Sequence, residues 1–370
     1  MKVMEGREAN LQAPNPVAGP EMGWKQKALA NCYFHSPLPA MVRPVRERYS
    51  LAVSRQGRWP RVSFEKRSEP SARILYYHRV NDDNDPFFPA ISTALFEEQM
   101  RFVSRYYRVV SLAELLDRLD GGSAEPVVAV TFDDGYRDNC LNAFPILERY
   151  GLPATIFLTT GSIDSGEPLW FEQMALGFKR STREWIDLEL GTPQRYRMRT
   201  QAERLDAIGR VFARLRNLPD LERRQGLAQI LNQLAFRDEG ERKNKMLTWE
   251  QVRIMQKRRI DFGGHTVTHP FLSRMPGEQV SWEVSECKRR MEEELQLPVS
   301  HFAYPNGREE DFGAWNKDLI RRAGYRAAVT TMWGVNYGST DPMELRRGGP
   351  WEPSAAQFAY KLDWYQLVND

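Results

Sequence analysis

From residue 74 onward, the sequence alternates short apolar runs with segments whose apolar residues recur every three or four positions. The short runs have the length of buried strands, and the segments between them have helical spacing, as at Leu112, Leu115 and Leu119. This alternation predicts parallel strands joined by crossover helices. The candidate strands span residues 74–80, 107–111, 127–133, 154–160, 260–265, 301–305, 326–331 and 344–348. Because polar motifs follow several of these strands, as they do at the carboxyl ends of barrel strands, we predict a β/α barrel.

The length and composition suit one large domain or two smaller ones with a sizeable core. The chain has 370 residues, of which 41% are hydrophobic and 27% are charged, and its net charge is only +3. This charge gives no general electrostatic support for nucleic-acid binding, so we expect no nucleic-acid partner. We expect the barrel over residues 71–352 and a C-terminal tail over residues 353–370.

Two stretches depart from the alternation. Residues 1–70 hold eight of the 23 prolines and 12 Lys and Arg residues against six Asp and Glu residues, which predicts an irregular basic leader. This leader is either a solvated extension or a tether to an anionic surface. Residues 164–246 are charged and favour helix, which predicts a helical insertion at the rim of the active site. The insertion either shapes a substrate groove or forms a solvated subdomain, and Trp170 within it is either a sugar-stacking edge or a core residue.

The cysteines and the apolar segments bear on the cellular compartment. Cys32, Cys140 and Cys287 show no C-x-x-C spacing, which argues against a disulfide framework and against a thiolate metal site. The sequence has no run of 18 apolar residues, so we expect no transmembrane segment. The first residues lack the apolar region of a secretory signal, which favours a cytoplasmic location while leaving export open.

Two motifs at predicted strand ends contain possible metal ligands. Asp133 and Asp134 end the run that begins at Val127, and His265 and His269 follow another short run. Either motif alone is weak, because paired aspartates often cap turns and two histidines often occur by coincidence. Together they supply oxygen and nitrogen ligands for a divalent metal and one carboxylate to spare, as a metal hydrolase requires.

The details of these motifs restrict the geometry further. Consecutive side chains of a strand point to opposite faces, so Asp133 and Asp134 cannot bind one ion in the same way unless the chain twists at Gly135. One carboxylate is therefore expected on the metal and the other on the water. Pro270 disfavours a continuous helix at His269, and no glutamate stands between the histidines, which argues against a zinc protease helix.

Three segments resemble the first signature motifs of the polysaccharide deacetylase family, the NodB-homology domain of carbohydrate esterase family 4. They are Thr131–Gly135, His265–His269 and Phe302–Gly307. The run Ile74–Val80, followed by Phe96–Met100, is similar to the branch that deacetylates exopolysaccharide. The resemblance extends from about Arg73 to Pro350 and does not include the first 70 residues. It implies a distorted (β/α) barrel of about seven parallel strands and the removal of N-acetyl groups from the amino sugars of a polysaccharide.

The resemblance also implies roles for individual residues. By family match, Asp134, His265 and His269 bind the metal, Asp133 is the general base, and the Asn306 N–H binds the developing oxyanion with the metal. Two imidazoles and a carboxylate suit zinc best, although the same donors accept nickel, cobalt or ferrous iron.

The sequence departs from the family pattern at two places. The histidine of the late Leu-x-His motif is missing, because the corresponding segment reads Leu345–Gly348, and we expect His78 to act as the general acid in its place. The arginine that usually precedes the third motif is also absent, so Arg347 or Arg346 could orient Asp133 instead.

Two other functions stay open from the sequence. The missing late histidine is compatible with a barrel that binds glycans and has weakened catalysis. The absence of a recognisable secretory signal is compatible with removal of another acyl group, such as formyl, from a lipid-linked or small sugar inside the cell.

Overall fold

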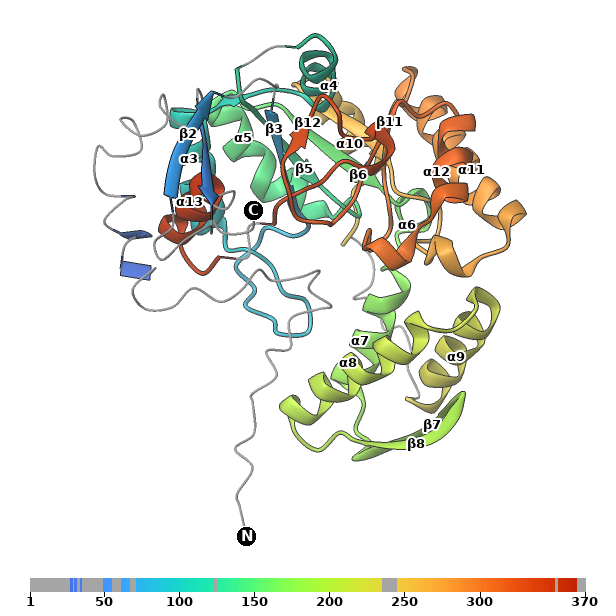
Figure 1. Cartoon of the computed structure of the whole chain (residues 1–370). Helices are drawn as coiled ribbons and strands as arrows, with labels where there is room; N and C mark the ends of the chain where they lie inside the picture. Colours follow the sequence, from blue (N-terminus) through green and yellow to red (C-terminus); the bar gives the residue numbers. More distant parts are fainter. Residues whose placement is uncertain are drawn as a thin grey trace.

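The computed structural model contains a curled, mostly parallel sheet with helices packed around it (Figure 1). It describes residues 71–122, 125–234, 245–349 and 352–364, with the short segments 27–28, 30–31, 34, 49–54 and 61–66.

Seven strands follow one path through this sheet in the order β11-β10-β9-β6-β5-β3-β12, and β4 pairs with β5 beside it. All neighbouring pairs are parallel except β12 with β3. The strands are β3 (Ser71–Tyr77), β4 (Arg108–Val109), β5 (Val127–Phe132), β6 (Ala154–Leu158), β9 (Ile260–Gly264), β10 (His301–Ala303), β11 (Ala327–Val329) and β12 (Asn336–Tyr337). The seven parallel strands confirm the predicted distorted (β/α) barrel.

A short segment bridges the two ends of the parallel sheet. Leu345 forms an isolated parallel bridge with Val329 of β11, and Gly348 forms another with Leu75 of β3. The candidate strand at residues 344–348 is thus present as two single bridges. This segment brings Arg347 to the interior of the barrel, where its side chain is fully buried.

Helices cover the outside of the sheet, as the periodic apolar residues predicted. They are α3 (Thr93–Tyr106), α4 (Leu112–Asp120), α5 (Phe144–Tyr150), α6 (Thr160–Ser165), α10 (Trp249–Gln256), α11 (Gly277–Leu295) and α12 (Ala314–Arg322). Ser92 and Ser111 cap α3 and α4, because each side chain accepts a hydrogen bond from a backbone N–H of the first turn. Single turns of other helix types lie at η1 (Asn139–Ala143), η2 (Leu272–Arg274), η3 (Glu309–Asp311) and η4 (Pro342–Glu344).

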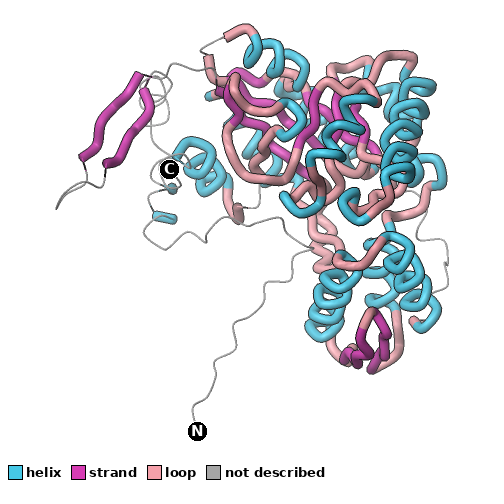
Figure 2. The backbone as a smooth tube through the Cα atoms, turned by 45° about the vertical axis from the view of Figure 1, so that its right-hand side comes forward, coloured by secondary structure: helices cyan, strands magenta, loops and turns pink. Residues whose placement is uncertain are grey.

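The stretch between β6 and β9 forms a lobe beside the barrel, at the lower right of Figure 1 and separate from the sheet in Figure 2. It contains the helices α7 (Trp170–Arg180), α8 (Gln201–Arg216) and α9 (Asp220–Gln233). Between α7 and α8 lies an antiparallel hairpin, β7 (Trp185–Leu190) and β8 (Thr192–Arg197). The helical character of residues 164–246 did not predict this hairpin, although buried and exposed residues alternate along β7 as in a half-buried strand. The lobe has its own apolar cluster, which includes Phe178, Ile186 and Val211.

The ends of the chain add two small elements. Most of the predicted irregular leader lies outside the described residues, but within it β1 (Tyr49–Ser54) and β2 (Arg61–Lys66) form an antiparallel pair that the sequence did not predict. In the predicted tail, α13 (Ala355–Trp364) packs on α3, where the ring centroids of Phe358 and Phe102 lie 6.4 Å apart.

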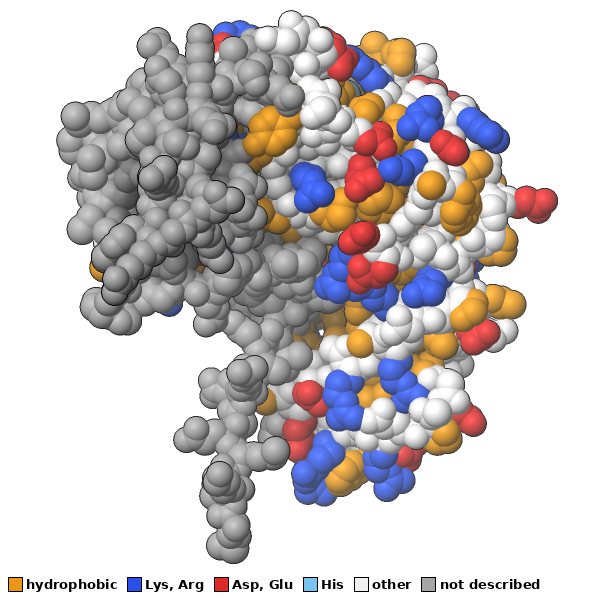
Figure 3. All heavy atoms as spheres, in the orientation of Figure 1, with side chains coloured by type: hydrophobic (Ala, Val, Ile, Leu, Met, Phe, Trp, Pro, Cys, Tyr) orange, Lys and Arg blue, Asp and Glu red, His pale blue; other side chains and the backbone are white. Residues whose placement is uncertain are grey.

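The visible surface carries charges of both signs. Lys and Arg side chains lie among Asp and Glu side chains over the described part of the face in Figure 3, in keeping with the small net charge. In the part of the chain that the structure describes, every helix is too short or too polar to cross a membrane.

Candidate metal centre

The polar motifs of the sequence meet where neighbouring parallel strands end. Asp133 and Asp134 follow β5, His265 follows β9, and Asn306 lies three residues after β10. These strands are neighbours or near neighbours in the sheet, in the order β10-β9-β6-β5. Their carboxyl ends therefore open on one side, and the side chains line a single cavity of about 550 Å³.

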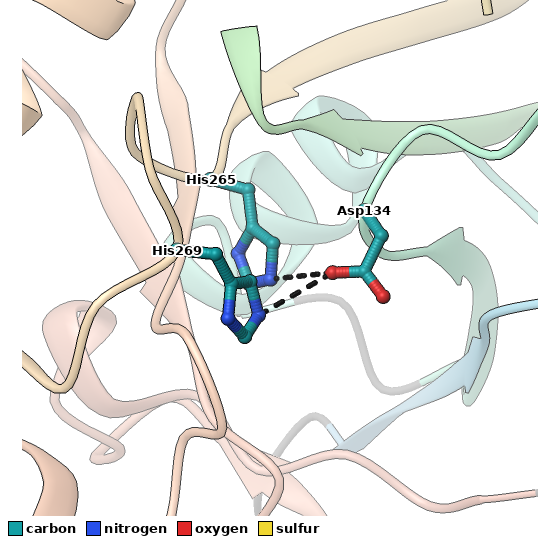
Figure 4. Close-up of side chains that lie close together, drawn as sticks. All are labelled: Asp134, His265 and His269. Atoms are coloured by element: carbon teal, nitrogen blue, oxygen red, sulfur yellow. Dashed lines mark ion pairs between the residues drawn. The ribbon is translucent and has the colours of Figure 1, made fainter. Parts of the chain in front are cut away.

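Asp134, His265 and His269 form a compact buried group (Figure 4). The Nε2 atoms of His265 and His269 both lie 3.4 Å from Asp134 Oδ1. This separation exceeds an ordinary hydrogen bond but equals the edge of a tetrahedron whose metal–ligand bonds are about 2.0–2.1 Å, which is roughly 3.3–3.4 Å. The three side chains thus fit a divalent ion with tetrahedral preference, and the group has no fourth protein ligand among the described residues.

Hydrogen bonds fix the orientation of the first imidazole. His265 Nδ1 lies 2.7 Å from the carbonyl oxygen of Ala303, to which it donates when the proton is on this nitrogen. The Nε2 lone pair then faces Asp134, as in metal sites whose histidine ligands are held by a second partner. Burial lowers the pKa of His269 to about 3, so the second imidazole is neutral and its nitrogens can also act as ligands.

Glu283 of α11 holds the turn that carries the two histidines. Its carboxylate accepts hydrogen bonds from the backbone N–H groups of Val267 (2.8 Å) and Thr268 (2.9 Å), and also from the Thr268 hydroxyl. The chain between His265 and Pro270 forms no helix, which confirms the prediction made from Pro270. Sequence reasoning missed Glu283, although an acidic residue three positions after Val280 on an apolar helix stripe is a signal of a buried partner.

Backbone strain concentrates at this centre. Seven non-glycine residues of the described chain have positive φ, and four of them are Asp134, Thr266, His269 and Asn306. Thr266 is β-branched, so its φ of 67° is a costly conformation. The φ of 75° at Asp134 turns this residue away from the strand, which places Asp133 and Asp134 in different surroundings. Such strain persists where the surrounding contacts determine the backbone, as they commonly do at functional sites.

Asp133 is held by Arg347 rather than by Arg346. Arg347 donates from its two terminal nitrogens to Asp133 Oδ1 (2.8 Å) and Oδ2 (2.7 Å), a bidentate pair. Arg347 also donates to the Thr330 carbonyl oxygen at 2.6 Å, whereas Arg346 points to the Trp333 carbonyl oxygen. Burial alone would raise the pKa of Asp133, but the charge and hydrogen bonds of Arg347 keep that pKa below its usual value. Asp133 is therefore ionised at neutral pH.

The two remaining predicted residues also line the cavity. His78 follows β3, its side chain is 29% exposed, and its Nε2 lies 4.0 Å from Asp133 Oδ2. Asn306 has a φ of 62°, and its carbonyl oxygen accepts a hydrogen bond from the Thr331 hydroxyl at 2.6 Å. Six of the seven predicted site residues line the cavity. The seventh, Arg347, lies behind Asp133 and is hydrogen-bonded to it.

The lobe contributes to the site through the start of α7. Trp170 is only 7% exposed, stacks on Phe212 with ring centroids 5.5 Å apart, and donates from Nε1 to the His269 carbonyl oxygen at 2.9 Å. It is therefore a core residue and not a sugar-stacking edge. The next residue, Phe171, lines the cavity and contacts the His269 ring edge-on at 5.3 Å between centroids.

Comparison with known proteins identifies the family to which this chain belongs. The sequence model described as polysaccharide deacetylase matches residues 120–328, more than half of the chain. The chain belongs to the polysaccharide deacetylase family, which confirms the resemblance drawn from the three motifs.

Curated relatives match over shorter regions. YxkH of Bacillus subtilis, a protein named as a polysaccharide deacetylase, is 33% identical over 130 residues, which are 33% of this chain and 46% of the relative. The poly-β-1,6-N-acetyl-D-glucosamine N-deacetylase of Escherichia coli is 31% identical over 115 residues, 30% of this chain and 16% of that enzyme. The chain thus aligns with less than half of the length of either relative.

Solved structures extend the likeness of the fold over most of the chain. The deacetylase PplD of Streptococcus pyogenes has a TM-score of 0.53 and 20% identity, covering 78% of this chain and 96% of that protein. IcaB from Ammonifex degensii has a TM-score of 0.52 and 21% identity, covering 80% and 97%. At these identities the comparison establishes the shared fold.

Proposed function

We propose that this chain is a metal-dependent hydrolase that removes N-acetyl groups from the amino sugars of a polysaccharide. The observation that carries the proposal is the pairing, in one cavity, of a buried Asp–His–His group with a carboxylate that is bound on both oxygens by a buried arginine. One group can hold a divalent cation, and the other can accept a proton beside it. Membership of a polysaccharide deacetylase family supports the type of reaction.

Asp134, His265 and His269 are the proposed ligands, and their carboxylate and imidazole donors favour zinc. When bound, a divalent ion would lower the pKa of a coordinated water and polarise the acetyl carbonyl group. The chain's own part is to orient His265 through the carbonyl oxygen of Ala303 and to keep His269 neutral through burial.

Asp133 is the proposed general base. Its carboxylate is ionised because Arg347 lies against it, and the bidentate contact fixes the plane of the carboxylate. A base held in this way has one fixed direction for accepting the proton of the attacking water. Arg347 acts through Asp133 and is a positioning residue, because Asp133 lies between it and the cavity.

Asn306 and His78 complete the proposed machinery. The Asn306 N–H is the proposed donor to the oxyanion of the tetrahedral intermediate. His78 is the proposed general acid, which protonates the sugar nitrogen as the C–N bond breaks. Its partial exposure to the cavity permits contact with a substrate, and its Nε2 atom lies on the same side of the cavity as the proposed base, 4.0 Å from Asp133 Oδ2.

The direct test is release of acetate from N-acetylated oligosaccharides by zinc-loaded protein. Asp133→Asn should keep the metal and lose about 10²-fold or more in rate, the usual contribution of a general base. Asp134→Asn should lose metal affinity, as measured by elemental analysis after dialysis. If the two variants show each other's expected behaviour, the roles of Asp133 and Asp134 are reversed. If the wild-type protein binds oligosaccharides without releasing acetate, the chain is a glycan-binding barrel and not a deacetylase.

The lining of the cavity supports a second candidate substrate, a sugar that carries a lipid or a longer acyl group. Leu205 and Ile208 of α8 and Phe87 of the loop after β3 contribute apolar side chains to the cavity wall. Such a wall cannot satisfy sugar hydroxyl groups, but it can bury an aliphatic chain. Faster hydrolysis of N-butyryl or alkyl-linked amino sugars than of N-acetyl oligosaccharides would favour this candidate.

A further inference from the structure

A third buried carboxylate, Glu172 of α7, lines the same cavity as Asp133 and Asp134. Its side chain is 4% exposed, and its Oε2 atom has no hydrogen-bond partner among the described residues. Buried acceptors are nearly always satisfied, because an unsatisfied one loses its hydration without compensation. Because Glu172 lines the cavity, a molecule bound in the cavity is a candidate source of a donor to Oε2.

The surroundings of Glu172 hold it in place but leave this oxygen without a hydrogen-bond partner among the described residues. Arg79 approaches Oε1 to 3.7 Å, and the backbone N–H of Leu169, at the start of α7, donates to the carboxylate. Arg79 is itself fixed, because its Nε donates to Asp138 at 3.1 Å and its guanidinium lies 4.9 Å from the centre of the Tyr136 ring. Glu172 is thus a rigid acceptor with its charge only partly compensated.

The electrostatic balance points the same way. Burial raises the pKa of Glu172 to about 7, because the positive charge of Arg79 does not offset the loss of hydration and the nearby charge of Asp134. A donor supplied from the cavity would stabilise the ionised form, as Arg347 does for Asp133. Helix capping alone accounts for the contact with Leu169, but it leaves Oε2 unexplained.

We propose that Glu172 is a substrate-binding residue whose Oε2 accepts a hydrogen bond from a hydroxyl group of the bound amino sugar. The inference rests on the proposed function for the kind of substrate and adds a specificity-determining contact outside the proposed catalytic residues. In its ionised form the carboxylate accepts and cannot donate, so its partner is a donor, such as a hydroxyl group, and not the N-acetyl carbonyl oxygen. The contact would place the sugar on the α7 side of the cavity, where Phe171 also lines the wall.

The chain offers a matched pair of variants for the test. Glu172→Gln keeps the shape and the cap acceptor for Leu169, but it puts an amide donor where one of the carboxylate oxygens was. Glu203→Gln makes the same change at the equivalent position of α8, where Glu203 accepts from the backbone of Arg199 (2.9 Å) and Thr200 (3.3 Å) and does not line the cavity. A difference between the two variants therefore reports on the cavity and not on helix capping.

Binding of β-1,6-linked and β-1,4-linked N-acetylglucosamine pentasaccharides would be measured by calorimetry, and kcat/KM would be measured from released acetate. Glu172→Gln should raise Kd and lower kcat/KM, each by about 10- to 100-fold, which is the range for a hydrogen bond to a charged group. Glu203→Gln should match the wild type in both quantities. The loss should disappear for one monodeoxy analogue, because removing the partner hydroxyl removes the contact in both proteins.

Equal behaviour of the two variants would overturn the assignment, as would a loss that is the same for every deoxy analogue. If Glu172→Gln fails to fold, the wild type still decides the matter, because the proposal requires that removing one particular hydroxyl weakens binding by at least about tenfold. Calorimetry separates this proposal from the proposed function: binding without acetate release would refute deacetylation and leave the subsite standing.

Discussion

Replacement of Arg347 by methionine isolates the pair that holds the proposed general base. Arg347→Met keeps a long, flexible apolar side chain near the rings of Tyr76 and Phe157, which the guanidinium approaches at 4.8 and 5.8 Å. It removes both hydrogen bonds to Asp133 together with those to Thr330 and Thr131. Asp133 is then left buried without its cation.

The expected loss of stability is large and depends on pH. Removing one partner of a buried ion pair costs about 3–5 kcal/mol at neutral pH. In the wild type, the lowered pKa of Asp133 contributes stability above its unfolded pKa of about 3.9, and this stability is lost as the pH falls through the folded pKa. In the variant, burial without Arg347 raises the pKa of Asp133, so protonation relieves the unpaired charge as the pH falls. The difference between the two proteins should therefore shrink from pH 7 to pH 4.

Urea unfolding, followed by intrinsic fluorescence at pH 7 and pH 4 with a chelator present, measures this difference without the contribution of metal binding. The double variant Asp133→Asn/Arg347→Met has neither charge, so it should be less destabilised than Arg347→Met alone. A destabilisation that is independent of pH, or a double variant whose loss equals the sum of the two single losses, would refute the account of Asp133 as an ion held by Arg347.

Three further predictions concern the rest of the site. His269→Ala should lose the bound ion and the acetate release together, and full metal occupancy by elemental analysis would remove His269 from the ligand set. His78→Ala should keep the ion and slow N-acetyl sugars by about 10²–10⁴-fold, with a much smaller loss on an activated acetate ester, whose leaving group does not need a proton; equal losses would indicate a structural role. Glu283→Gln keeps one of the two carboxylate acceptors and should weaken metal affinity by about 10- to 100-fold in a competition titration, and an unchanged affinity would show that the turn is stable without it.

Much of the barrel could be predicted because its elements are marked by local patterns. The strand predicted at 127–133 occupies Val127–Phe132, and the strand predicted at 260–265 occupies Ile260–Gly264. The nearly continuous apolar run of β5 marks a strand that is buried on both faces, whereas β9 is shorter and carries the exposed Asp261. The apolar stripe of the helix after His269 is also present, with Val280, Val284 and Cys287 buried in α11. Proposed ligands that directly follow such strands lie at the carboxyl ends of the strands, so the order of the strands in the sheet determines which ligands are neighbours.

The choice between Arg346 and Arg347 shows where sequence reasoning stopped. Neighbouring residues of an extended segment point to opposite sides, so one of the two arginines had to face the barrel. The sequence contains no signal for which one, because the segment has only two isolated bridges, at Leu345 and Gly348, and no long apolar pattern to fix its faces. The structure places Arg347 inside with no exposed surface and leaves Arg346 exposed.

The first turn of α7 joins the lobe to the proposed metal centre through three consecutive residues with different tasks. Trp170 binds the backbone of His269, Phe171 packs on its ring, and Glu172 lines the cavity beside it. This division follows from helix geometry, because successive side chains are about 100° apart around the axis and therefore reach different atoms. The apolar periodicity of a helix indicates only which face is apolar. The sequence therefore indicated a buried Trp170 as one alternative, but it did not indicate that Glu172 lines the cavity. The lobe is therefore a part of the site itself, since the turn that carries His269 rests on it.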